Sequence, residues 1–123
     1  HTENWTDANT VAQAYELNNP MTAVVKENEG GNLADEYSLF KVDRDNVVIE
    51  TVKKAENGEE LIVRLYECYN RRTNVTLICG EEIADAVECN LLEEDEKQVS
   101  FADNTVSLLI RPYEIKTLKI KLK

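Results

Sequence analysis

The sequence contains one histidine, two prolines and four glycines among its 123 residues. Nucleophilic catalysis by serine or cysteine needs a base that a third group holds in place, and His1, at the first position, is poorly placed to serve as one. A zinc site needs about four clustered Cys, His or carboxylate ligands, which a single histidine and well-separated cysteines do not provide. We therefore expect no serine or cysteine catalytic triad and no zinc site in this chain.

The three cysteines also lack the pattern of a metal or disulfide site. Cys68, Cys79 and Cys89 form no C-x-x-C pair, and an odd number cannot make a complete disulfide set. Each stands in a strand-like apolar stretch, where a buried structural thiol is more common than a reactive one. The sequence therefore favours a reducing compartment, and we expect a cytoplasmic location.

Long apolar runs and an excess of positive charge are absent as well. No run approaches the roughly 20 apolar residues of a membrane-spanning helix, and no basic start precedes an apolar core, so we expect neither a membrane span nor a signal peptide. The 24 acidic and 14 basic side chains give a formal net charge of −10. Such a chain repels phosphate backbones and anionic lipids, so we expect neither nucleic acid nor a membrane surface as a partner.

The clearest structural signal is a pair of apolar-rich runs within residues 46–70, separated by Ala55-Glu56-Asn57-Gly58. Asn-Gly between such runs is typical of a β-hairpin, because both residues tolerate the positive φ that a type I′ turn requires. We predict a long hairpin with a type I′ turn here.

Short segments of similar character make up most of the remaining chain. A helix is predicted at about residues 7–18, after an N-cap at Thr6 or Asp7 and before Pro20. Residues 21–26 are β-prone, and further strands are predicted at residues 37–42, 74–79, 83–91, 99–101, 106–111 and 115–122. Short strands at intervals of roughly 8 to 12 residues are typical of a sandwich. The prediction is an all-β fold, an antiparallel β-sandwich of about 7–8 strands with one short N-terminal helix. It forms one domain over residues 1–123, with strands at about 21–122.

Two alternation patterns predict how strands are oriented. Ile83, Val87, Cys89 and Leu91 fall on one face of their segment, which predicts that this face is the dry one. Lysines alternate with apolar residues in the last segment, 115–122, a pattern that discourages another sheet from pairing with an edge strand. We therefore predict that the last strand lies at a sheet edge.

Carboxylates within strands are the first candidate functional groups. Glu50, Glu67 and Glu88 interrupt apolar segments rather than standing in turns. Glycoside hydrolysis uses two such carboxylates, although a position on a solvated strand face is the more common case. The acidic run at residues 93–96 is interpreted as a solvated turn.

Aromatic residues and one arginine are the other candidates. Trp5, Tyr66 and Tyr69 could form a sugar-stacking surface, or could equally be core residues and cross-strand pairs. Arg64 lies in the middle of a predicted strand. It either forms a salt bridge to a carboxylate on a neighbouring strand, such as Glu50, or contributes to a docking interface.

Four segments, in order AYELNNP, NVVIETVKKAENGEELIVRLYECYNRR, VECNLLEED and PYEIKTLKIKL, together resemble the C-terminal end of glycoside hydrolase family 38 α-mannosidases. The similarity covers nearly the whole chain and is closest to the cytosolic-type subgroup shared by bacteria and vacuolar enzymes. It implies a β-sandwich appended to a much longer, retaining enzyme that hydrolyses terminal α-mannosides. In such enzymes zinc and the aspartate nucleophile lie in an N-terminal catalytic domain, so no catalytic residue carries over to this chain and zinc is expected only in that domain.

The resemblance predicts a non-catalytic module that supports domain packing and assembly. Its partner would be the catalytic domain of the same polypeptide, with homo-oligomer formation by the parent enzyme as a further possibility. The alternative is a carbohydrate-binding module that recognises mannose-containing oligosaccharides through strand aromatics. For either function, the predicted contact residues are Arg64, Tyr66, Glu67, Tyr69 and Trp5.

Overall fold

The computed structural model describes residues 4–25, 27, 30–31 and 34–123, and the chain divides into two compact units, residues 1–35 and 36–123. The first unit contains α1 (Thr10–Asn18), which confirms the predicted helix, although it begins after Asn9 rather than at Thr6 or Asp7. None of the helix residues is buried within the structure.

Residues 21–25 form no strand, contrary to the prediction, while Lys26 lies outside the described residues. β-branched residues favour a strand only where a neighbouring strand can pair with them, and residues 21–25 have no such pairing.

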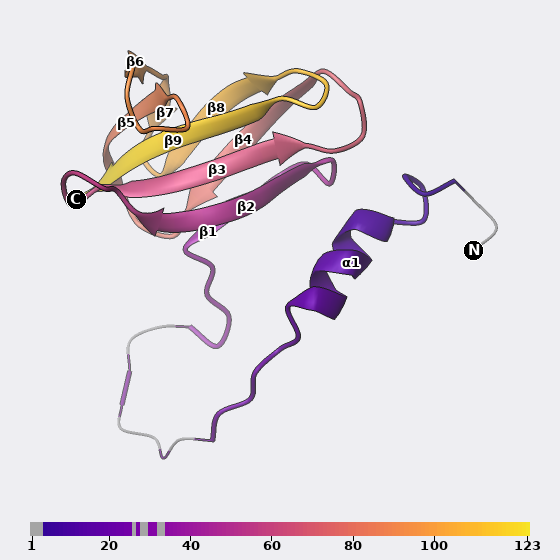
Figure 1. The fold of residues 1–123 in the computed structure, drawn as a ribbon. Coiled ribbons are helices and arrows are strands. Elements are labelled where there is room, and N and C mark those ends of the chain that lie inside the picture. Colours follow the sequence, from indigo (N-terminus) through magenta and orange to yellow (C-terminus); the bar gives the residue numbers. More distant parts are fainter. Residues whose placement is uncertain (1–3, 26, 28–29, 32–33) are drawn as a thin grey trace. The chain divides into compact units, whose positions relative to one another are not determined.

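The second unit is an all-β sandwich of two antiparallel sheets, as predicted (Figure 1). One sheet has the strand order β1-β4-β8-β7 and the other the order β2-β3-β9-β5-β6. The strands are β1 Phe40–Val42, β2 Val47–Lys54, β3 Leu61–Glu67, β4 Thr73–Cys79, β5 Ile83–Cys89, β6 Lys97–Gln98, β7 Phe101–Ala102, β8 Thr105–Ile110 and β9 Ile115–Leu122.

Apolar side chains from both sheets form one core between them. Its buried members are Val47, Val63, Leu65, Val75, Leu77, Cys79, Ile83, Ala86, Val106, Leu108, Ile110, Leu118 and Ile120. All three cysteines are buried and none forms a disulfide, as the sequence predicts. Each fully buried aliphatic side chain contributes about 1.5–3 kcal/mol relative to an exposed one, so this core is the main source of stability.

The predicted hairpin is present as β2 and β3, but its turn is not of type I′. The last strand pair joins Lys54 to Leu61, and the backbone N–H of Ala55 donates to the carbonyl of Glu60 at 2.9 Å. Gly58 has φ +112°, whereas Asn57 is not among the residues of the described chain with positive φ. The loop is therefore longer than a two-residue turn, and only its glycine needs the left-handed side of φ space.

The last strand, β9, lies in the middle of its sheet rather than at the predicted edge. It pairs with β3 on one side, where Val63 faces Leu118, and with β5 on the other, where Val87 faces Lys119. Lys119 faces away from the core and pairs with the carboxylate of Glu96 at 2.5 Å. The alternating lysines thus mark the outer face of a central strand, where Glu96 of the loop after β5 pairs with Lys119.

A β-bulge in β5 overturns the predicted face of that strand. The register of β5 against β9 shifts between Ile83 and Asp85, so the phase of the alternation changes. Ile83 and Ala86 join the core, whereas Val87 is buried on the opposite face of the sheet. Leu91, also predicted on the dry face, lies beyond the strand and is 56% exposed.

Candidate interaction site on the outer face of the five-stranded sheet

The outer face of the five-stranded sheet is defined by β3. Val63 and Leu65 enter the core, so by strand alternation Ile62, Arg64 and Tyr66 face outward. Ile62 is nevertheless fully buried, with 0% of its surface exposed. The outer face must therefore be covered over part of its area.

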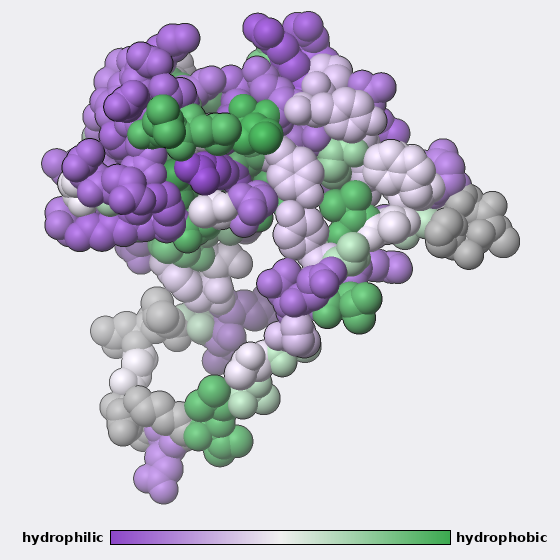
Figure 2. All heavy atoms as spheres, in the orientation of Figure 1, coloured by the Kyte–Doolittle hydropathy of each residue, from purple (hydrophilic) through white to green (hydrophobic). Residues whose placement is uncertain are grey.

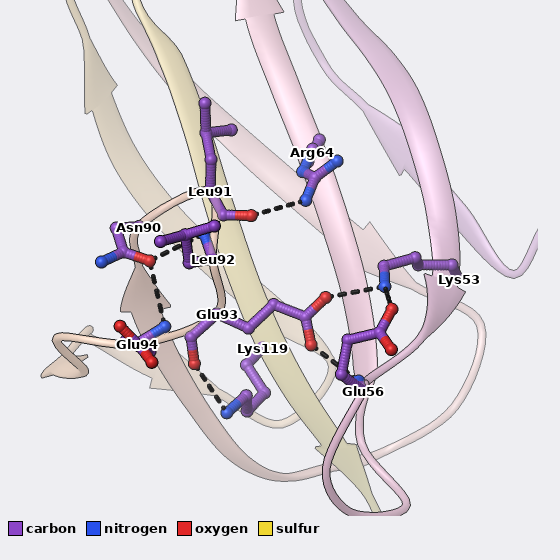
Figure 3. A network of polar contacts seen from close by, with 9 residues as sticks. All are labelled: Lys53, Glu56, Arg64, Asn90, Leu91, Leu92, Glu93, Glu94 and Lys119. Carbon is purple, nitrogen blue, oxygen red and sulfur yellow. Dashed lines mark hydrogen bonds and ion pairs between the residues drawn. The ribbon is translucent and has the colours of Figure 1, made fainter.

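The cover is the loop between β5 and β6, residues 90–96, which crosses β9 and β3 (Figure 3). The side-chain oxygen of Asn90 accepts hydrogen bonds from the backbone N–H groups of Leu92 at 2.8 Å and Glu94 at 3.1 Å. The Asn90 N–H in turn donates to the carbonyl of Glu94 at 2.9 Å. These bonds close the loop on itself, so that it acts as a compact element rather than a free strand connection.

Glu93 fastens this loop to the sheet. Its carboxylate pairs with the ammonium group of Lys53 at 2.7 Å and accepts the backbone N–H of Glu56 at 2.7 Å, while its carbonyl accepts from the ammonium group of Lys119 at 3.2 Å (Figure 3). The hydrogen bond from Lys53 is the main cause that lowers the pKa of Glu93 below its ordinary value. The interpretation of residues 93–96 as a solvated turn is therefore wrong for Glu93, which is buried.

Arg64 also contacts the loop. Its Nη2 donates to the carbonyl of Leu91 at 3.0 Å, in place of the salt bridge to Glu50 that the sequence suggested (Figure 3). Glu50 stands at a bulge in β2, between Ile49 and Thr51, and its carboxylate accepts a hydrogen bond from the Thr51 hydroxyl. The Nε of Arg64 is buried without a hydrogen-bond partner, the only such side-chain atom found in the described part of the chain.

Exposed apolar side chains lie on the same face as Arg64 and on the loop that it contacts. Tyr66 faces Ile115 across the β3–β9 pair, and Ile115 is 58% exposed. The loop adds Leu91 and Leu92, which is 77% exposed. On the face seen in Figure 2, hydrophobic side chains of the sandwich form a group bordered by hydrophilic ones. We define the β3 patch as Arg64, Tyr66, Leu91, Leu92 and Ile115.

Comparison with known proteins agrees with this sandwich. Residues 46–118 match the family described as glycosyl hydrolases family 38 C-terminal beta sandwich domain. The chain belongs to this family. It is 30% identical to human alpha-mannosidase 2C1 over the whole chain and 28% identical to the mouse protein of the same name. Alpha-mannosidase G of Dictyostelium discoideum is 31% identical over 67% of the chain.

This family 38 sandwich corresponds to a small part of the length of those relatives. The chain spans 12% of the length of the human and mouse proteins and 8% of the Dictyostelium protein. Most of each relative therefore has no counterpart in the residues described.

The three strand carboxylates of the family 38 sandwich are engaged in separate contacts. Glu88 pairs with the ammonium group of Lys116 at 2.7 Å and 2.8 Å. Glu67 is 1% exposed, contrary to the expectation of a solvated position. Glu50 is hydrogen-bonded at its bulge, so each of the three carboxylates has structural partners of its own.

Glu67 is a buried hub at one end of the sandwich. Its Oε1 accepts from the side-chain amide of Asn46 and the backbone N–H of Tyr69, both at 2.8 Å, and its Oε2 accepts from the backbone N–H of Tyr113 at 3.0 Å. Burial raises the pKa of Glu67, but the hydrogen bonds from Tyr113, Asn46, Tyr69 and Arg71 together outweigh burial and lower it. Sequence patterns do not reveal this hub, because three of its donors are backbone N–H groups, and one of these, Tyr113, lies 46 residues away.

The predicted contact residues differ in exposure and in the elements that carry them. Arg64 and Tyr66 share the outer face of β3, whereas Tyr69 is 7% exposed and Glu67 is buried. Trp5 is 45% exposed and belongs to the first unit, residues 1–35. Leu91, Leu92 and Ile115 are not among the predicted residues, because the loop that carries the two leucines and strand β9, which begins at Ile115, lie far from β3 in the sequence.

Two features are absent from the described residues, a metal-ligand cluster and a membrane-spanning helix. No group of three or more His, Cys, Asp or Glu side chains in them is placed to hold a metal ion. No helix in the same part of the chain has the length and apolar character to cross a bilayer.

Proposed function

We propose that this chain is a non-catalytic module of a family 38 α-mannosidase and that it supports the packing and assembly of that enzyme. The observation that carries the proposal is the match over the whole chain to proteins named alpha-mannosidase, of which it spans 12%. The separate engagement of Glu50, Glu67 and Glu88 supports it, since each carboxylate already has a structural partner.

The activity belongs to the parent enzyme in this proposal. The parent hydrolyses terminal α-mannosides with retention, in the cytoplasm, and uses zinc held in an N-terminal catalytic domain. The described residues do not fit a zinc site. The partner of the module is the catalytic domain of the same polypeptide, and contacts between copies of the parent are a further way in which the module would support assembly.

The β3 patch supports the packing role. A soluble domain rarely exposes contiguous large apolar side chains unless another surface covers them. Here Leu91, Leu92 and Ile115 are each more than half exposed on one face of the sheet, beside Arg64 and Tyr66. We infer that the sequence-predicted contact residues Arg64 and Tyr66 belong to the docking surface.

Recognition of mannose-containing oligosaccharides is the rival function. It is favoured by the exposure of Trp5 and the partial exposure of Tyr66, because an aromatic face can stack on a sugar ring. Tyr69, with only 7% of its surface exposed, could take part only through its rim. Glu67 has its carboxylate oxygens occupied by N–H donors, so its contribution would be to hold Tyr69 in place.

Two measurements test the proposal. In the full polypeptide, deletion of residues 36–123 should lower the melting temperature of the remaining part and reduce its turnover of an aryl α-mannoside. In the undeleted enzyme, removal of zinc with a chelator should abolish that turnover. Unchanged stability and turnover after the deletion would contradict the packing role. NMR titration of this chain with mannose oligosaccharides tests the rival, which requires saturable shifts at Trp5, Tyr66 or Tyr69.

A further inference from the structure

We propose that Arg64 receives a carboxylate of the catalytic domain, within a segment whose flanking apolar side chains pack on Leu91, Leu92 and Ile115. This inference rests on the proposed function, because the occupant of the β3 patch is another part of the same polypeptide. It goes further in naming the chemistry of that segment, an Asp or Glu between apolar residues.

The first argument compares Arg64 with the other partly buried cations. Of the basic residues in the described part of the chain, four are partly buried: Lys53, Arg64, Lys116 and Lys119. The three lysines each pair with a carboxylate at 2.5–2.7 Å. Arg64 has only the neutral carbonyl of Leu91 as an acceptor. Among the described residues, Arg64 is therefore the one partly buried cation without a carboxylate partner, and it belongs to the β3 patch.

The second argument is the donor capacity of the guanidinium group. Arginine carries five N–H donors in a planar fork that matches a carboxylate. One hydrogen bond, from Nη2 to Leu91, is made, and Nε is buried without a partner. A buried donor without an acceptor is unfavourable, and the charge of Arg64 also lacks a counter-ion. An incoming carboxylate would supply the missing counter-ion to the guanidinium group.

The third argument concerns the surroundings of the charge. Leu91, Leu92 and Ile115 are 56%, 77% and 58% exposed. Apolar groups from a partner that cover these side chains would exclude water from the arginine, and ion pairs are stronger where water is excluded. Arginine within an apolar ring is a typical centre of a tight interface.

The fourth argument is that the patch is held in place before docking. Glu93 fastens the loop to Lys53 and to the backbone N–H of Glu56, and Asn90 closes the loop on itself. Leu91 and Leu92 are thus presented by a fixed loop, which lowers the entropy cost of association.

A second copy of this chain is a poorer occupant. A two-fold contact through the β3 patch would bring like charges at Arg64 together, between two chains that each carry a net charge of −10. The chain covers 12% of relatives with which it aligns over its full length, so the larger part of the polypeptide is available to supply the carboxylate.

Photo-crosslinking in the full polypeptide tests the inference. A photoreactive phenylalanine replaces Leu92 in one sample and Leu109, 46% exposed on a strand of the other sheet, in the control. We expect intramolecular crosslinks from position 92 to a segment that contains Asp or Glu flanked by apolar residues, and few or none from position 109. Arg64→Glu should lower the yield at position 92 about tenfold, whereas Arg111→Glu, at an exposed site, should not.

The outcomes separate the two proposals. Crosslinks from position 109 but not from position 92 overturn this inference and leave the packing role intact. Crosslinks from position 92 to a segment without a carboxylate, or to a second copy of the chain, also overturn it. An absence of crosslinks from both positions contradicts the packing role itself. Because the crosslinked peptide is identified in the enzyme with Arg64 intact, the test does not depend on the Arg64→Glu variant folding.

Discussion

The Glu67 carboxylate accepts a hydrogen bond at 3.0 Å from the backbone N–H of Tyr113, which lies 46 residues further along the chain. This contact ties the end of β3 to the turn between β8 and β9. The same carboxylate binds Asn46, whose amide also donates to the hydroxyl of Thr73 at 2.7 Å. One buried side chain therefore joins connections before β2, after β3 and before β9, and its charge is stabilised by N–H donors rather than by a cation.

Glu67→Gln should destabilise the sandwich by about 2–3 kcal/mol. The glutamine can place only one oxygen among the donors, so its amide group would face the N–H of Tyr113 or of Tyr69. Urea denaturation followed by circular dichroism measures the change. Glu59→Gln is the matched control, because Glu59 is exposed and pairs only with Lys54 on the surface. A Glu67→Gln variant as stable as this control would show that the hub is dispensable.

Stability should fall in mildly acidic solution, and Glu67 should contribute to the fall. Its hydrogen bonds lower its pKa in the folded state, so the folded protein binds this proton less readily than the unfolded chain does. The resulting stability is present above the ordinary pKa of 4.5 and is lost as the pH falls through the lower, folded-state value. Denaturation midpoints are measured from pH 7 downward for the unchanged protein and for Glu67→Gln. Below pH 4.5 the midpoints of Glu67→Gln should decline less steeply than those of the unchanged protein. Parallel curves for the two proteins would contradict this.

The sandwich and its central hairpin were predictable because period-2 alternation and Asn-Gly are local signals. The strand order was not predictable from the sequence. Lys119 and Lys121 in β9 suggested an edge strand, but β5 pairs with β9 on the side opposite to β3, so β9 is central. A bulge at Asp85 changes which side chains of β5 enter the core, and a single sequence gives no sign of it.

Two of the five residues of the β3 patch were predictable for the same reason. Arg64 and Tyr66 stand out as functional groups within a strand segment and share a face by simple alternation. Leu91 and Leu92 join them only because Glu93 anchors a distant loop to β2, a long-range contact between charged residues that local sequence patterns do not encode.

Ile62 and Ile115 should respond very differently to truncation although both lie on the outer face of the five-stranded sheet. Ile62 is 0% exposed because the loop covers this part of the face, so Ile62→Ala should cost about 2–4 kcal/mol of unfolding free energy. Ile115 is 58% exposed, and Ile115→Ala should cost less than about 1 kcal/mol. Urea denaturation of the two variants provides the comparison. Equal losses would mean that the loop does not form a second packed layer.

Glu93→Gln should loosen the loop of residues 90–96 while leaving the sandwich core intact. The carboxylate of Glu93 holds Lys53 and the N–H of Glu56, and a neutral amide loses the ion pair and offers only one acceptor oxygen. We expect amide hydrogen exchange within residues 90–96 to become about tenfold faster, with exchange in β4 and β8 unchanged. Glu94→Gln is the matched control, since Glu94 is exposed and its hydrogen bonds in the loop are made by its backbone. Equal amide exchange rates in the two variants would show that Glu93 does not fasten the loop. The β3 patch would then lack the fixed support for Leu91 and Leu92 on which its docking role depends.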